Sequence, residues 1–203
     1  MARYTGPKER ICRRFGVALF GPSKALERRN YPPGQHGARA GRRKKSDYSV
    51  ALGEKQKLKF MYGLLEKQFR SYYENAASQR GITGDIILQL LETRLDNVCF
   101  RLGFGNSRQG ARQMVNHGHI LVNGQRVDVA SYQVRPGDVV KVGPKASSQQ
   151  LGMRSLDLTQ SIPLKDWLTI DRDKLEGTVN RLPEAADIDS IVDVQRVVEL
   201  YSR

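Results

Sequence analysis

The chain has 203 residues, of which 39% are hydrophobic and 27% are charged, a balance that is typical of a soluble protein and unlike that of a fibre or membrane protein. It has no apolar run near the roughly 20 residues that a membrane-spanning helix needs, and its N-terminus lacks the apolar core of a secretory signal. Its only cysteines, Cys12 and Cys99, lie far apart in sequence. Together these features predict a cytoplasmic protein that needs no disulfide.

The net charge of +13 and the pI near 10.0 are the first indication of function. Residues 1–80 carry 19 Lys and Arg against 6 Asp and Glu, residues 81–158 carry 9 against 6, and residues 159–203 carry 6 against 9. Positive charge concentrated in one part of a chain favours a polyanionic partner, for which nucleic acid and an anionic membrane surface are the usual candidates. A basic, solubilising tail is the simpler alternative, but a mixture of Arg with turn residues suits contact with phosphate.

Residues 1–46 are interrupted by Gly and Pro, as at Gly6-Pro7 and Gly21-Pro22, so we expect no long regular element there. Few apolar side chains remain to form a core, and we expect the segment to be mobile when free and ordered on a partner. Aromatic and His side chains among the cations suit stacking on unpaired bases, and anchoring to the following helices is an equal alternative. These side chains are Tyr4, Phe15, Phe20, Tyr31 and His36.

Residues 52–80 have apolar side chains at three- and four-residue spacing, which predicts one or two amphipathic helices with a break at Gly63. Residues 84–103 predict one further helix that stops at Gly103. Ser107 and Gly118 suit the start and the end of another helix. One face of that helix would pack, while the opposite face would be rich in hydrogen-bond donors.

The sequence after this helix predicts a small sheet. Residues 119–122 are followed by Asn123-Gly124 and then by residues 125–127, the strongest short signal for a tight hairpin. Residues 132–134 and 139–142 flank a second turn at 135–138. Beyond Pro144 we expect a polar linker at 145–150 and a final apolar stretch that packs back onto the body.

These residues carry a resemblance to a known family. The stretch from Glu92 to Val142, with RLDNVCFRLGF, SRQGARQMVNHGHILVNGQRV and RPGDVV, closely resembles the S-four RNA-binding domain. The flanking motifs MARYTGP, YPPGQHG, EKQKLKFMYG and VVELYSR are similar to the bacterial small-subunit ribosomal proteins S four. Members of that family with four N-terminal cysteines bind zinc, but only Cys12 stands in that region here, so the chain resembles the zinc-free form and we expect no metal and no cofactor.

The resemblance implies an α+β fold with a helical N-terminal domain, an extended basic N-terminal segment and an inserted S-four domain, in which short helices pack on a small, strongly bent antiparallel sheet. The expected boundaries are 1–46 for the basic, RNA-contacting segment, 47–91 completed by 159–203 for the helical domain, and 92–158 for the S-four domain.

The resemblance also implies a structural component of the small ribosomal subunit in a bacterial or organelle-encoded ribosome. Such a protein would bind the 5′ domain of 16S-type rRNA, nucleate subunit assembly and, with ribosomal protein S five, contribute to translational accuracy. Other small-subunit proteins, and messenger RNA where it enters the subunit, are further implied partners. The excess of acidic residues over 159–203 suits protein contact.

An enzymatic alternative is an RNA pseudouridine synthase, because Arg94-Leu95-Asp96 matches the start of that family's catalytic motif. The sequence continues with Asn97-Val98-Cys99 where the motif needs Thr and a small residue before Gly, and it precedes the S-four stretch instead of following it. We therefore predict no enzymatic activity and expect Asp96 to pair with nearby arginines. A non-ribosomal S-four protein that acts on stalled ribosomes or tRNA is the alternative among binding modules.

Histidines at 117 and 119 could suggest a metal site or a general base, but no Cys or carboxylate cluster accompanies them, so contact with RNA is favoured. The predicted RNA-binding residues combine cations with aromatic, hydroxyl and amide side chains. They are Arg3, Tyr4, Arg13, Arg14, Arg28, Arg29, Tyr31, Gln35, His36, Arg42, Arg43, Lys44, Lys45, Lys55, Lys57, Ser107, Arg108, Arg112, Gln113, Asn116, His117, His119 and Asn123.

Overall fold

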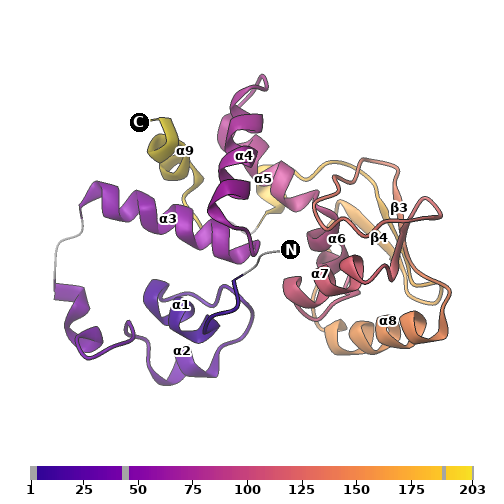
Figure 1. Cartoon of the computed structure of the whole chain (residues 1–203), viewed down its shortest axis with the longest axis horizontal. Coiled ribbons are helices and arrows are strands. Elements are labelled where there is room, and N and C mark those ends of the chain that lie inside the picture. Colours follow the sequence, from indigo (N-terminus) through magenta and orange to yellow (C-terminus); the bar gives the residue numbers. More distant parts are fainter. Residues whose placement is uncertain (1–3, 43–45, 189–190, 203) are drawn as a thin grey trace. The chain divides into compact units, whose positions relative to one another are not determined.

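The computed structural model describes residues 4–42, 46–188 and 191–202 (Figure 1). The chain forms two compact units: unit 1 comprises residues 1–84 and 190–203, and unit 2 comprises residues 85–189. The described part of unit 1 is helical, whereas that of unit 2 combines helices with an antiparallel sheet. The α+β class predicted from the sequence is confirmed.

In unit 1 the predicted break at Gly63 separates two helices, and its φ of +64° is a conformation that glycine adopts without strain. The helix before it begins at Ser46, whose hydroxyl oxygen accepts a hydrogen bond from the Ser49 backbone N–H. The elements of unit 1 are α1 (Lys8–Phe15), α2 (Lys24–Arg28), the 3₁₀ helix η1 (Gly37–Arg42), α3 (Asp47–Met61), α4 (Glu66–Ala77) and α9 (Val194–Ser202).

The N-terminal segment contains more structure than the sequence indicated. The helix α1 ends at Gly16, whose φ of +69° turns the chain back, and Ile11, Cys12 and Leu19 are buried in a small apolar cluster. Phe60 of α3 packs against this cluster. The expectation that too few apolar side chains remain for a core was wrong here, because a tight turn brings those few together against α3.

The last helix packs on the first unit, as expected for the final apolar stretch. Val197 of α9 is fully buried, and α9 contacts α3 (Figure 1). The ring of Tyr201 stacks on Tyr73 of α4 with 4.7 Å between centroids, and its hydroxyl donates to Glu66 Oε1 at 2.9 Å. Hence α9, although distant in sequence, is joined to α3 and α4.

Unit 2 is built around a five-stranded antiparallel sheet with the strand order β2-β1-β3-β5-β4. Inward-facing Val140 and Val142 of the sheet pack with Val98 and Val115 of two helices in one apolar core. The elements are α5 (Thr83–Glu92), α6 (Leu95–Arg101), α7 (Arg108–Asn116), β1 (Ile120–Val122), β2 (Gln125–Arg126), β3 (Val139–Val142), α8 (Ala146–Thr159), β4 (Leu168–Asp171), β5 (Glu176–Val179) and the 3₁₀ helix η2 (Ala185–Asp187).

The predicted helix and hairpin of unit 2 are confirmed. Ser107 caps α7 by accepting a hydrogen bond from the Gly110 N–H at 3.1 Å, and Gly118 follows the helix with a φ of +69°. Asn123 and Gly124 both have positive φ, 50° and 81°, as a type I′ turn requires.

The single helix expected at 84–103 is instead two, α5 and α6. Between them Arg94 is extended, with φ −64° and ψ 137°, and forms a β-bridge with Gln133. The Leu95 N–H donates to the Tyr132 carbonyl at 2.8 Å. The segment 132–134 therefore pairs with the break between the helices, and not with β3 as the predicted second turn implied.

The C-terminal part of unit 2 also differs from expectation. The predicted polar linker at 145–150 forms the first turns of α8. The expected helical domain included 159–203, but β5 pairs with β3 through Val139↔Thr178 and Val140↔Gly177, and only residues 190–203 belong to unit 1. Pairing satisfies the backbone groups of β3 that would otherwise form an open sheet edge.

Candidate nucleic-acid interface

The helix α7 carries most of the polar side chains that the sequence singled out in unit 2. Its apolar face, with Ala111, Met114 and Val115, is buried, and this burial fixes the direction of the remaining side chains. Arg108 and Arg112 follow each other by four residues and therefore lie on one side of the helix. That side meets α6 and the end of α5 rather than solvent.

The buried carboxylate of Glu92 organises the first group of cations. Its Oε1 lies 2.8 Å from Arg101 Nη2, and its Oε2 accepts from Arg101 Nε at 3.0 Å and from Asn97 Nδ2 at 2.7 Å. Arg108 donates from Nε to Asn97 Oδ1 at 2.8 Å and lies over the ring of Phe100, with 4.8 Å to the centroid. Arg108 is thus positioned by several groups before any ligand arrives.

A second buried carboxylate, that of Asp96, binds Arg94 through two hydrogen bonds of 3.0 and 2.8 Å. Arg112, which is only 7% exposed, lies 3.9 Å from the same carboxylate. The expected role of Asp96 as a partner of arginines agrees with this geometry. Since buried charges need partners, Arg112 packs α7 against α6 and presents little of its surface to RNA.

The far end of α7 is more open. Gln113, Asn116 and His117 are exposed, whereas His119 is half-buried, with its Nδ1 2.8 Å from the Ser148 hydroxyl. Burial lowers the pKa of His119, and the positive charges of His117, Lys145 and Arg126 lower that pKa further. Burial and the nearby cations thus both favour the neutral form of the His119 ring.

Asn123 and Ser107 have structural contacts. The Asn123 side chain accepts from the Val139 N–H at 2.9 Å and donates to Asp138 Oδ1 at 2.8 Å, which ties the hairpin turn to the start of β3. Ser107 caps α7. Both side chains therefore stabilise the local backbone, at the start of α7 and at the hairpin turn, through these hydrogen bonds.

Three exposed cations near the end of α7 were missed from the sequence: Arg126, Lys145 and Arg154. Arg126 packs so closely over Gly118 that a Cβ there would lie 2.1 Å from its Nε. The position of Arg126 directly after the hairpin turn could have indicated it. The other two were hidden because the start of α8 has the composition of a linker.

In unit 1 Arg13 and Tyr31 hold the N-terminal segment together. Arg13 Nε lies 3.2 Å from the carbonyl oxygens of both Arg29 and Tyr31, and its guanidinium lies over the Tyr31 ring at 5.1 Å. Tyr4 contacts the Phe60 ring edge-on at 5.2 Å. For these residues the structure favours the anchoring alternative over stacking on bases.

The other predicted residues of unit 1 are exposed, paired with carboxylates, or outside the described part of the chain. The exposed ones are Arg14, Arg28, Arg29, Gln35 and His36. Lys55 is 8% exposed and pairs with Glu66, while Lys57 pairs with Glu54 at 2.6 Å. The pairs stabilise the helices and engage both ammonium groups. Predicted positions outside the described residues or side chains are Arg3, Arg42, Arg43, Lys44 and Lys45.

The described residues contain no group of three or more His, Cys, Asp and Glu side chains placed to hold a metal ion. Both Cys12 and Cys99 are buried free thiols, and burial raises the pKa of Cys99 strongly. Within the same described ranges, no helix has both the length and the apolar character needed to cross a membrane.

Comparison with known proteins identifies the family. The model for the ribosomal protein S4/S9 N-terminal domain matches residues 3–92, and the model for the S4 domain matches residues 93–140. The small ribosomal subunit protein uS4 of Akkermansia muciniphila is 66% identical over 203 residues, which cover 100% of both chains. The chain belongs to the uS4 family.

Two more uS4 proteins are similar over the full length of both chains: that of Opitutus terrae is 52% identical and that of Thermus thermophilus 49% identical. These relatives are named as ribosomal proteins and not as enzymes, which agrees with the predicted absence of catalysis. The matched S4 domain runs from the α5–α6 break to β3. Outside that match, this uS4 chain adds α8, β4 and β5 to the same unit.

Proposed function

We propose that this chain is a structural, RNA-binding protein of the small ribosomal subunit that binds 16S-type rRNA and nucleates assembly. The observation that carries the proposal is the match of the two family models, which together span residues 3–140. The net charge of +13 supports RNA as the ligand, because neutralising closely spaced phosphates releases counterions and strengthens binding.

The exposed members of the predicted set are the best candidates for direct contact. Apart from Tyr31 and Asn123, whose contacts are internal, these are Arg14, Arg28, Arg29, Gln35 and His36 in unit 1 and Gln113, Asn116 and His117 in unit 2. Cations on two separate units can bind two segments of RNA, so phosphate contacts would position the protein while amide and imidazole groups reach bases.

The test is equilibrium binding of the purified chain to the 5′ domain of small-subunit rRNA at near-physiological salt, with bulk tRNA as competitor. We expect tight binding that tRNA does not displace. Replacing both Arg28 and Arg29 by Ala should reduce the slope of log K against log salt by about 0.7–0.9 for each phosphate that these side chains neutralise. Equal competition by tRNA would reduce the chain to a general RNA-binding module and favour the non-ribosomal alternative.

Nucleation of assembly requires binding to rRNA that carries no other protein. The internal anchoring of the N-terminal segment by Arg13 supports such early binding, since a partly ordered segment loses less entropy on the RNA. In stepwise reconstitution, omitting this chain should stop later proteins from joining the 5′ domain. Binding only after other proteins are present would contradict this role.

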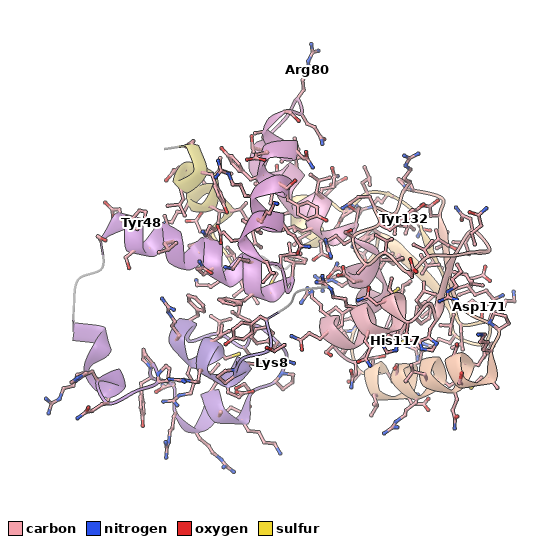
Figure 2. All side chains as sticks on the ribbon, viewed as in Figure 1. Lys8, Tyr48, Arg80, His117, Tyr132 and Asp171 are labelled. Carbon is pink, nitrogen blue, oxygen red and sulfur yellow. The ribbon has the colours of Figure 1, made fainter. Side chains whose placement is uncertain are left out.

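Contact with ribosomal protein S five, and through it an effect on accuracy near the incoming messenger RNA, is supported by one face of unit 1. The helices α3 and α9 border a hollow of about 430 Å³, whose lining includes three acidic residues, Asp47, Asp193 and Glu199. It also includes one cation, Arg196, which pairs with Asp193 at 2.9 Å. Tyr48, 58% exposed, lies at the start of α3 (Figure 2). An acidic surface with an exposed aromatic ring suits a basic protein partner.

The matched variants are Glu199→Lys in α9 and Asp173→Lys in unit 2, because both residues are exposed and the charge change is the same. Glu199→Lys should weaken association with ribosomal protein S five and raise misreading, with rRNA affinity no lower than in the native chain. Equal effects of both variants would indicate a general charge effect and contradict this contact.

A further inference from the structure

A groove lies between α7 and α8 in unit 2, near the end of α7. Its volume is about 260 Å³, slightly below the roughly 300–1,000 Å³ typical of sites for drug-sized ligands. Gln113 and His117 of α7 form one wall, and Leu151, Arg154 and Leu158 of α8 form the other. Figure 2 shows His117 beside α8. The size suits one planar heterocycle better than a peptide segment.

The α8 wall combines apolar surface with a cation in an unusual way. Leu151 is 39% exposed and Leu158 is 63% exposed, and both lie in the same groove as Arg154. Exposed leucines beside a cation offer apolar contact to the face of an unstacked base, and the cation can pair with the neighbouring phosphate. A purely electrostatic RNA surface would have no use for these leucines.

The opposite wall supplies polar groups. Gln113 has both a donor and an acceptor on its amide, and Asn106 lines the same groove. Among the described residues that line the groove, none is acidic. The half-buried His119 also lines the groove, and Lys145 and Arg126 lie close enough to this ring to lower its pKa.

From this geometry we propose that the groove between α7 and α8 binds one unpaired base of an RNA strand, with its flanking phosphates beside Arg154 and Lys145. The inference rests on the proposed RNA-binding function and adds a specific site to it. The base would lie against Leu151 and Leu158, and its edge would hydrogen-bond the Gln113 amide. Sequence-specific recognition of RNA uses such unstacked bases because the A-form major groove is too narrow to read.

A protein partner fits the groove less well. A stable protein interface covers roughly 800 Å² on each partner, while this hollow is small and is lined by the cation Arg154 and by no carboxylate of the described residues. The apolar side chains are also too few for the core of such an interface. RNA accounts for the leucines, the amide and the cations together.

The experiment measures binding of the full chain to two fluorescent probes at low salt: a pentamer of adenylate and an abasic ribose-phosphate pentamer of equal charge. The native chain should bind the adenylate pentamer about fivefold tighter, which corresponds to about 1 kcal/mol of apolar contact. Leu158→Ser and Gln113→Ala should each bring this ratio close to one. Both residues are exposed, so these variants should fold.

The matched control is Ile162→Ser. Ile162 is an aliphatic residue of similar exposure, 54%, that follows α8 but does not line the groove, and its variant should keep the native ratio. Equal affinity of the native chain for both probes would overturn the base site, as would a ratio that persists in Leu158→Ser or disappears equally in Ile162→Ser.

Binding to the 5′ domain of small-subunit rRNA distinguishes this failure from a failure of the proposed function. A native chain that binds this rRNA but does not prefer the adenylate probe lacks the base site and keeps its ribosomal role. A chain that prefers the adenylate probe but does not bind this rRNA has the base site and lacks the ribosomal role.

Discussion

Replacing Arg13 by Ala should weaken RNA binding without removing a phosphate contact. Arg13 Nε shares its hydrogen between the carbonyl oxygens of Arg29 and Tyr31, each at 3.2 Å, and Nη2 lies 3.5 Å from the Pro32 carbonyl oxygen. The guanidinium also lies over the Tyr31 ring. These contacts fold residues 29–32 back on α1.

The expected loss of RNA affinity can be calculated from the free energy of these Arg13 contacts. The shared hydrogen bond has a charged donor but long N···O distances of 3.2 Å, so it stabilises the folded-back segment by about 1.5 kcal/mol. The exposed cation–π contact adds about 0.5 kcal/mol. A change of about 2 kcal/mol lowers the population of the folded-back segment roughly 30-fold relative to open forms. If RNA binds only the folded-back segment, its affinity falls by up to the same factor.

The assay is RNA affinity measured over a range of salt concentrations for Arg13→Ala, Arg13→Lys and Arg14→Ala. Both Arg13 variants should lose affinity with an unchanged salt slope, because Lys lacks the planar fork that reaches several carbonyl groups. Arg14 is an exposed neighbour, and its replacement should lower the slope by about 0.7–0.9. A lower slope in Arg13→Ala together with full rescue by Lys would refute the anchoring role and identify Arg13 as a phosphate contact.

Three further predictions concern stability. Asp96→Asn should lower the free energy of unfolding by about 3 kcal/mol in denaturant titrations, because it leaves the buried Arg94 guanidinium without its carboxylate. Tyr201→Phe should cost about 1 kcal/mol through removal of the hydrogen bond to Glu66. Burial would raise the pKa of Glu66, but hydrogen bonds from Lys55, Tyr201 and Lys59 outweigh it and lower that pKa; the stability this carboxylate provides is therefore present above its unfolded pKa and is lost as pH falls through its lowered folded pKa.

Controls separate these effects. Asp157→Asn removes an exposed carboxylate on α8 and should leave unfolding unchanged, so an equal decrease in both aspartate variants would contradict the role of the buried pair. Acid titration of unfolding in Glu66→Gln should lose part of the pH dependence of the native chain. An acid limb identical in both chains would show that Glu66 does not contribute to it.

Elements with local signals were predictable from the sequence. The cap at Ser107, the turn at Asn123-Gly124 and the break at Gly63 each depend on the chemistry of one or two residues, and all three occur as predicted. The break between α5 and α6 has no Gly or Pro and depends on backbone hydrogen bonds to Ala130 and Tyr132. A periodic apolar pattern continues through such a break, so only the tertiary contacts reveal it.

The candidate site was partly predictable for the same reason. Four-residue spacing placed Arg108 and Arg112 on one face of α7, but not the direction of that face, which depends on the carboxylates of Glu92 and Asp96. The sequence around Glu92 and Asp96 does not show with which arginines these carboxylates form ion pairs. Arg154 was missed because no helix was predicted over residues 146–159, where α8 forms.

The packing of α9 on α3 delays completion of unit 1 until the end of translation. During translation α3 leaves the exit tunnel long before α9, so the apolar face that receives Val197 stays uncovered until the last part of the chain emerges. Unit 2 comes from one continuous stretch between them, and such a unit can fold on the nascent chain. A product truncated before α9 would therefore combine a folded unit 2 with an incomplete unit 1, and we expect cellular proteases to degrade it.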